Sequence, residues 1–171
     1  MEGKGLLFKR FADIDVFDIE VATQDVEEFI TVVKNIAGTF GGINLEDISA
    51  PRCFEIEKRL QELVDIPVFH DDQHGTAVII AAGLLNALTI QSKAIEDVRI
   101  VCVGAGAAGV ASMNLLAALG ADKSKLMMVD SKGVINTQRT DLNGFKQQFA
   151  VETDCQTLAD ACRNADVFIG L

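Results

Sequence analysis

The feature that most constrains the fold is a glycine-rich turn between a predicted strand and a predicted helix. The apolar run at 98–103 (VRIVCV) has the length and composition of a buried strand, and a helical stretch extends from the turn to about Leu119. The turn has the spacing G-x-G-x-x-G, which is typical of a βαβ unit that binds a dinucleotide. Its residues are Gly104, Ala105, Gly106, Ala107, Ala108 and Gly109.

Each glycine of this turn has a predicted role. Gly104 permits a tight turn, Gly106 lets the backbone approach a pyrophosphate, and Gly109 lets the helix pack close to the strand. The helix N-terminus then presents free N–H groups and a partial positive charge to the phosphates. The alternative is a structural glycine turn in an unrelated α/β protein.

Asp130 ends the next predicted strand and would lie beside the adenosine end of a bound dinucleotide. A carboxylate there can accept hydrogen bonds from the ribose, which favours NAD. Ser131 and Lys132 follow directly, and a hydroxyl and a cation could hold a 2′-phosphate, which favours NADP. The alternative for these two residues is a capped, solvated turn. The choice between NAD and NADP stays open on these residues.

Strand and helix signals alternate along the rest of the chain. We expect strands at 16–21, 39–45, 67–70, 98–103, 125–129 and 167–169. We expect helices at 25–36, 74–90, 142–149 and 157–163, and another that follows Ser49 and buries Cys53, Ile56, Leu60 and Leu63. This order predicts an α/β fold with mostly parallel sheets and helices on both faces. The hydrophilic link at 91–97 predicts two parts, 1–91 and 92–171.

Composition narrows the function classes. The formal net charge of -10 opposes binding to nucleic acid or to an anionic membrane. The most apolar stretch, 77–90, is too short to span a bilayer, and no secretory signal is recognisable, so we expect no membrane partner. Four cysteines without a C-x-x-C pair indicate reduced, mostly buried thiols in a cytoplasmic protein without structural zinc.

Two acidic doublets follow predicted strands: Glu46-Asp47 and Asp71-Asp72. The carboxyl ends of parallel strands meet at one edge of a sheet, so both doublets should project there. Converging carboxylates repel one another unless a cation lies between them, and oxygen ligands suit Mg²⁺ or Mn²⁺. The alternative is a set of surface loop acids. We expect His70 to end its strand, and both it and His74 to be core or site-wall residues.

The sequence also resembles a known family. The stretches MEGKGLLFKRFADIDVFDIEV, TFGGINLEDISAPRCFEIE, IPVFHDDQHGT, VGAGAAG and VDSKGVI resemble the malic enzymes, most closely the bacterial NADP-dependent type. The resemblance implies part of an α/β catalytic domain at 1–91 and the first half of a Rossmann-like NAD(P)-binding domain at 92–171. It also implies divalent-metal-dependent oxidative decarboxylation of malate to pyruvate and CO₂, by a homodimer or higher homo-oligomer.

The resemblance assigns roles residue by residue. Glu46, Asp47 and Asp72 would bind the metal, either Mg²⁺ or Mn²⁺. Lys4 would be the catalytic base, and Asp71 would hydrogen-bond that lysine. The turn from Gly104 to Gly109 would bind NADP or NAD.

The chain departs from the family at its ends. Family members carry an upstream tyrosine that acts as a general acid, whereas this chain has no tyrosine. The last predicted strand runs to the final residue without the substrate-binding asparagines of the family. We therefore expect an internal fragment that lacks activity by itself. Two alternatives are a metal-independent dehydrogenase of amino or hydroxy acids and a non-catalytic nucleotide-binding module.

Overall fold

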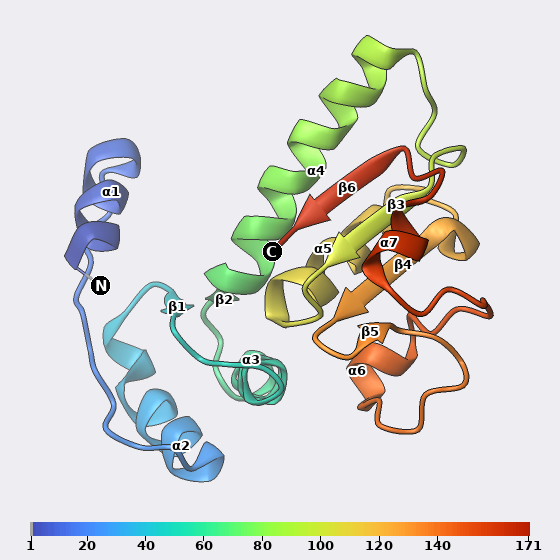
Figure 1. Cartoon of the computed structure of the whole chain (residues 1–171). Coiled ribbons are helices and arrows are strands. Elements are labelled where there is room, and N and C mark those ends of the chain that lie inside the picture. Colours follow the sequence, from blue (N-terminus) through green and yellow to red (C-terminus); the bar gives the residue numbers. More distant parts are fainter. Residues whose placement is uncertain (1) are drawn as a thin grey trace. The chain divides into compact units, whose positions relative to one another are not determined.

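The computed structural model describes residues 2–171, which form two compact units (Figure 1). The first unit contains 2–46 and 55–69, and the second contains 47–54 and 70–171. The division into parts at 91–92 stays a prediction. The long apolar helix before that position packs in the core of the second unit.

The first unit is mainly helical. Strands β1 and β2 pair as a two-stranded sheet. Helix α2 is capped by Asp25, whose side chain accepts a 2.8 Å hydrogen bond from the N–H of Glu28, and it buries Ile30 and Val33. The elements are α1 (Glu2–Ala12), α2 (Val26–Ile36), the 3₁₀ helix η1 (Ala37–Thr39), β1 (Ile43–Leu45), α3 (Arg52–Leu63) and β2 (Val68–His70), with the start of α3 and the end of β2 in the second unit.

Some expectations for this part of the chain are wrong. The strand expected at 16–21 is an extended loop that pairs with no strand within residues 2–171, and Phe17 is 71% exposed. Alternation of apolar and polar residues favours a strand only when a neighbouring strand is available. The strand expected at 39–45 is shortened to 43–45, because two glycines precede it. In α3, Leu63 is exposed, although Cys53 and Leu60 are buried as expected.

The second unit contains a four-stranded sheet in the order β5-β4-β3-β6. Strands β4 and β6 both run parallel to β3, with Ile100 beside Leu126 and Val167, and β5 alone is antiparallel. The mostly parallel α/β fold is therefore confirmed. The elements are α4 (Asp71–Gln91), β3 (Ile100–Val103), α5 (Ala107–Ala118), the 3₁₀ helix η2 (Lys123–Lys125), β4 (Leu126–Asp130), β5 (Gly133–Val134), α6 (Gly144–Gln147), α7 (Leu158–Cys162) and β6 (Val167–Gly170).

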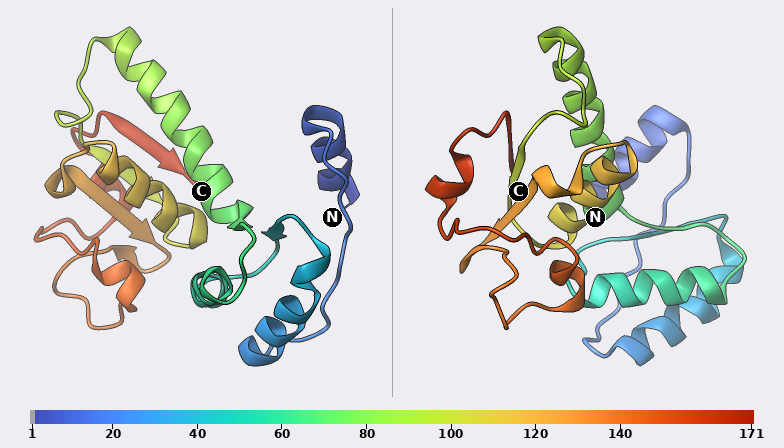
Figure 2. Two further views of the ribbon diagram at one scale, coloured as in Figure 1. Left: turned by 180° about the vertical axis from the view of Figure 1, so that it is seen from behind. Right: turned by 90° about the vertical axis from the view of Figure 1, so that its right-hand side faces the viewer.

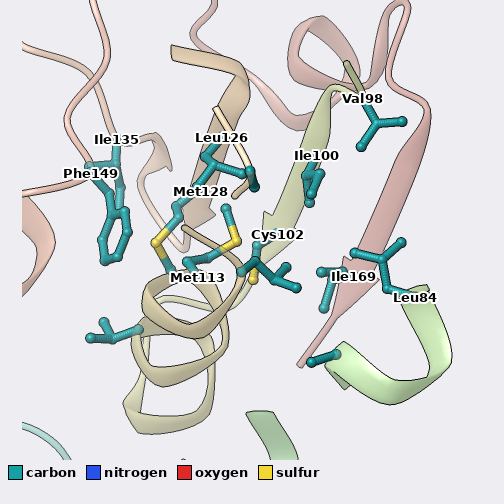
Figure 3. Packing of buried hydrophobic residues seen from close by; sticks show 14 of the residues in the cluster. Leu84, Val98, Ile100, Cys102, Met113, Leu126, Met128, Ile135, Phe149 and Ile169 are labelled. Carbon is teal, nitrogen blue, oxygen red and sulfur yellow. The ribbon is translucent and has the colours of Figure 1, made fainter. Parts of the chain in front are cut away.

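Both faces of this sheet are covered. Successive residues of a strand point to opposite faces, so Cys102 joins one apolar cluster and Val101 joins another. Figure 3 shows Met113, from α5, among Cys102 and Met128 of the sheet. The smaller cluster on the other face includes Ala161 of α7. Helices on both faces were expected from the alternation of strands and helices.

Helix α4 has 21 residues and is the one helix of residues 2–171 that is long and apolar enough to cross a membrane, by length and composition alone. Ala81, Leu84 and Leu88 place one side of it in the larger core cluster, and α4 lies beside α5 (Figure 2). This packing accounts for the apolar residues on that side of the helix only, since Val78, Ile79 and Ile90 are 58%, 74% and 80% exposed. The helix begins at Asp71 rather than at the expected His74.

All four cysteines are free. Cys53 and Cys102 are buried, whereas Cys155 is half-buried and Cys162 is exposed, so only two match the expectation of buried thiols. Burial raises the pKa of the Cys102 thiol to about 11, which keeps it protonated at neutral pH.

Candidate cofactor cleft and acidic sites

The glycine-rich turn follows β3 and has the geometry predicted for each glycine. Gly104 has φ +108°, a backbone conformation that residues with a side chain rarely adopt. A β-carbon at Gly109 would lie 1.9 Å from the carbonyl oxygen of Gly104, so only glycine permits this approach of helix to strand. Gly106 has φ −86°, and a β-carbon there would point into open space. Open space at the second glycine is what close approach of a phosphate requires.

The turn opens α5 with an uncapped N-terminus. Gly106 is the N-cap residue and supplies no side-chain hydrogen bond to the first turn. The N–H groups of that turn can therefore hydrogen-bond an anion, and the helix dipole favours one there. A cleft of about 500 Å³ lies along this edge of the sheet. It is lined by Ala50, Pro51, Val103, Gly104, Ala105, Gly106, Val129, Asp130, Ser131, Asn143, Lys146 and Leu171.

Asp130, at the end of β4, is the centre of an ion-pair network. Its side chain is 8% exposed. Arg139 donates to both carboxylate oxygens, at 2.8 and 3.1 Å, and Lys146 Nζ donates to Oδ2 at 2.7 Å. The backbone N–H of Lys132 donates to Oδ1 at 2.9 Å. Burial opposes ionisation of Asp130, but these hydrogen bonds outweigh it and hold the pKa of the carboxyl well below its usual range.

The side chain of Lys132 points away from Asp130. Its Nζ lies 2.7 Å from Asp141 Oδ2, its side chain is 66% exposed, and it does not line the cleft. Arg139 bridges the two carboxylates, because its Nε also donates to Asp141 Oδ1 at 2.9 Å. The network therefore has three positive charges and two negative ones, a net charge of +1 beside the cleft. The cations are Lys132, Arg139 and Lys146, and the carboxylates are Asp130 and Asp141.

Sequence reasoning missed the cation that lines the cleft, Lys146, and the cation that clamps Asp130, Arg139. The segment around Lys146 was expected to be helical, and it does form α6, capped by Asn143. The loop before α6 returns the chain to the end of β4. No local pattern in the sequence indicates that return.

In the first unit, the predicted base and a predicted metal ligand are in contact. Lys4, on α1, places its Nζ 2.6 Å from Oε1 of Glu46, which directly follows β1. The side chains are 32% and 11% exposed, respectively. The second oxygen of Glu46, Oε2, accepts a 2.7 Å hydrogen bond from Asn44 Nδ2. The Glu46 carboxylate therefore already holds one cation and one neutral donor.

In the second unit, the other two predicted metal ligands are neighbours. Asp47 has φ +56°, and its N–H donates to Asp72 Oδ2 at 3.3 Å. Asp71 and Asp72 occupy the first turn of α4, where the helix dipole stabilises negative charge. His70 is fully buried at the end of β2, and its Nε2 lies 3.8 Å from Asp72 Oδ2.

These carboxylates fit a hard divalent cation by donor chemistry, since they offer only oxygen atoms. The ammonium of Lys4 on Glu46 shows that this carboxylate accepts a positive charge at short distance. Across residues 2–171, no three His, Cys, Asp or Glu side chains are already arranged as a metal cage. His74 lines a separate cavity of about 390 Å³ between α4 and α5.

Comparison with known proteins gives two family matches in order along the chain. The family described as "Malic enzyme, N-terminal domain" matches residues 1–61, and "Malic enzyme, NAD binding domain" matches residues 73–168, more than half of the chain. The NADP-dependent malic enzyme of Halomonas elongata is 60% identical over 171 residues, which are all of this chain and 40% of that protein. The NAD-dependent malic enzyme of Geobacillus stearothermophilus is 54% identical over 175 residues, which cover 36% of that protein.

Solved structures give the same result. The malic enzyme of Entamoeba histolytica superposes with a TM-score of 0.93 at 41% identity, over 99% of this chain and 38% of that one. The NAD-dependent malic enzyme of Thermotoga maritima superposes with a TM-score of 0.92 at 46% identity, over 99% of this chain and 46% of that one. The chain thus spans less than half the length of these relatives.

Proposed function

We propose that this chain, which belongs to the malic enzyme family, supplies the metal-binding and cofactor-binding residues of an enzyme that converts malate to pyruvate and CO₂. The observation that carries the proposal is the 2.6 Å contact between Lys4 Nζ and Glu46 Oε1, which joins a base to a carboxylate 42 positions away. An amine that can act as a base in its neutral form and a carboxylate that can bind a metal are the two groups that a metal-assisted oxidation of an alcohol requires.

The carboxylates hold the metal in this proposal. Glu46 and Asp47 are consecutive, so their Cα atoms are about 3.8 Å apart. Asp72 is tied to Asp47 by the backbone hydrogen bond described above. A bound Mg²⁺ or Mn²⁺ supplies Lewis acidity to the 2-hydroxyl and later to the 2-keto group of the substrate. Lys4, in its neutral form, takes the proton of the 2-hydroxyl, and Asp71 helps to orient Lys4.

The turn and cleft hold the dinucleotide. The N–H groups of the first turn of α5 bind the pyrophosphate, and residues at the end of β4 bind the adenosine end. The dinucleotide held there would supply the hydride acceptor that the oxidation of malate requires. The part played by the protein is to hold the substrate carbon and the ring in line while water is excluded.

We infer that NADP is the preferred cofactor. Both oxygens of Asp130 are already engaged by Arg139 and Lys146, so this carboxylate is less available to ribose hydroxyls than an unpaired one would be. Lys146 lines the cleft, and a 2′-phosphate could take its Nζ from Asp130. Ser131, also in the lining, adds a hydroxyl donor. Relatives of both cofactor types match this chain, so the preference is inferred from these contacts.

A cytoplasmic homodimer or higher homo-oligomer completes the proposal. Helix α1 exposes Leu6, Leu7 and Phe11, and Phe11 is 81% exposed. A contact with another subunit would bury this apolar surface. The four free thiols fit a reducing compartment. Sedimentation equilibrium of the full-length enzyme would give the oligomeric state.

The decisive experiment measures malate-dependent reduction of NADP and NAD by the full-length enzyme, with Mn²⁺ and with EDTA. We expect turnover with release of CO₂ that EDTA abolishes. Asp72→Asn should weaken Mn²⁺ binding and turnover, whereas Asp154→Asn, at an exposed acid of the same unit, should change neither. Turnover that survives EDTA would favour a metal-independent dehydrogenase. Nucleotide binding without turnover would favour a non-catalytic module.

A further inference from the structure

Asn44 contacts the Glu46 carboxylate from two positions earlier in the chain. Asn44 lies in β1 and Glu46 directly follows it, and positions i and i+2 of an extended chain share a face. Asn44 Nδ2 donates to Glu46 Oε2 at 2.7 Å, in a partly buried hydrogen bond. A short hydrogen bond to an ionised acceptor is among the stronger ones in proteins and restricts rotation of the carboxylate.

The two oxygens of Glu46 are therefore held by groups of different character. Oε2 is bound by the neutral amide of Asn44, which lies in β1. Oε1 is bound by the ammonium of Lys4, on a long and partly exposed side chain. The amide is fixed by the strand, whereas the lysine can move by rotating several side-chain bonds. Oε1 is consequently the oxygen at which one cation can be exchanged for another.

The orientation of the Asn44 amide supports a role toward Glu46 rather than toward the fold. Its Oδ1 is buried and has no hydrogen-bond partner in the described part of the chain. A flipped amide would place an acceptor against the carboxylate, so the observed orientation is the only one that satisfies Glu46. An unpaired buried acceptor destabilises a fold. An apolar residue of similar size would avoid that loss but would leave Oε2 without its donor.

We propose that Asn44 is a positioning residue that fixes the Glu46 carboxylate, so that Oε1 is the oxygen passed between Lys4 and the divalent cation. This inference rests on the proposed function, because it assigns the cation to the same carboxylate. When the cation binds at Oε1, Lys4 Nζ is released from the Glu46 carboxylate. Without Asn44 the carboxylate can rotate, and either oxygen can remain with Lys4.

The test is Mn²⁺ binding to the full-length enzyme by titration calorimetry, without substrate. Asn44→Leu keeps the branching at Cγ but removes the donor, and should raise the Mn²⁺ Kd about tenfold, the factor that corresponds to the loss of one charge-assisted hydrogen bond. Its melting temperature should stay equal or rise, because the unpaired Oδ1 is also removed. Asn44→Gln, which keeps an amide donor, should recover part of the affinity. Lys4→Met should lower the Kd, since Oε1 is no longer shared.

The matched control is Asn86→Leu. Asn86 also donates its amide in a 2.9 Å hydrogen bond, but to the carbonyl of Ala82 on the exposed side of α4. Its loss should leave the Mn²⁺ Kd unchanged. If Asn44→Leu fails to fold, Asn44→Ser, which removes the amide but stays polar, must show the same loss of affinity.

The outcomes separate this inference from the proposed function. Wild-type enzyme that binds Mn²⁺ and oxidises malate, together with an Asn44→Leu variant of unchanged Kd, would overturn the role of Asn44 and leave the function intact. Wild-type enzyme that binds no Mn²⁺ would overturn both. A raised Kd with an unchanged melting temperature supports the inference. If Asn44 served only the fold, its loss would lower both the Mn²⁺ affinity and the stability.

Discussion

The carboxylate of Asp71 lies directly over the α-carbon of Gly75, one turn further along α4. A β-carbon added at Gly75 would be 2.1 Å from Asp71 Oδ1 and 3.0 Å from its carboxyl carbon. Side chains at i and i+4 share a helix face, so a glycine is what leaves room for the acid to fold back along the helix. The glycine of the HDDQHGT stretch therefore sets the position of the residue proposed to orient Lys4.

Gly75→Ala should separate stability from activity. Alanine favours a helix over glycine by about 1 kcal/mol, so unfolding by denaturant should show unchanged or higher stability. The displaced Asp71 should lower kcat by roughly 100-fold, as expected for a misplaced catalytic group. Gly83→Ala, in the same helix, meets no atom within 4 Å and should keep full activity. Equal kcat in the two variants would show that the position of Asp71 does not matter.

Much of the fold could be predicted because its signals are local. The alternation of apolar runs with helical spacing located β3, β4 and β6, and the glycine spacing located the start of α5. The loop at 13–25 was not predicted, because its apolar alternation looks like a strand when neighbours are ignored. Helix α1 was not anticipated either, although its first residues were recognised as part of a family motif.

The candidate site was predictable only where a charged residue directly follows a strand or where the family resemblance assigns a role. Asp130 was found because it follows β4, and the family resemblance supplied Lys4. The partners of Asp130 were missed, since Arg139 and Lys146 reach it across a loop and a short helix. Asn44 was missed for a different reason. Its position two residues before Glu46 was visible, but a neutral amide on a strand gives no chemical signal until its partner is known.

Gly106→Val should abolish dinucleotide binding while the fold survives. The backbone at Gly106 has a negative φ, which valine adopts readily, and its β-carbon would project into open space. In the bound state that space would be taken by the phosphates, so calorimetry should detect no nucleotide affinity. Gly109→Ala is the contrasting variant, because its β-carbon would collide with the carbonyl of Gly104 and should lower the melting temperature. Retained affinity in Gly106→Val would place the pyrophosphate elsewhere.

The stability that the ion pairs of Asp130 contribute should not change with pH until the solution is strongly acidic. Despite its burial, hydrogen bonds from Arg139 and Lys146 depress the pKa of Asp130 in the folded state. A carboxyl whose pKa is depressed in the folded state stabilises the protein at pH values above its unfolded-state pKa, about 3.9. That stabilisation is lost as the pH falls through the lower folded-state pKa. Asp130→Asn should therefore lower the free energy of unfolding by about 1–3 kcal/mol at pH 7, and the difference should narrow only below about pH 4.

Urea unfolding of both proteins at several pH values measures this difference. Asp154→Asn, at an exposed site, serves as the control and should track the wild type throughout. A difference that already disappears between pH 7 and pH 5 would mean that the Asp130 carboxyl titrates in its ordinary range and that its ion pairs add little.

Lys146, rather than Lys132, should determine the preference for NADP. Lys146 Nζ faces the cleft from α6 at 2.7 Å from Asp130, whereas Lys132 is exposed and bound to Asp141. A charge-assisted contact with a 2′-phosphate contributes about 1.5–3 kcal/mol when partly desolvated, which is about one to two decades of kcat/KM. Asp130 opposes the phosphate, but Arg139 remains bound to both its oxygens and offsets that repulsion.

In the full-length enzyme, Lys146→Ala should lower the kcat/KM ratio of NADP over NAD about tenfold or more, and Lys132→Ala should change it less than twofold. A wild-type ratio below one would refute the preference, and a ratio that moves with Lys132 alone would show that this exposed lysine turns into the cleft when cofactor binds.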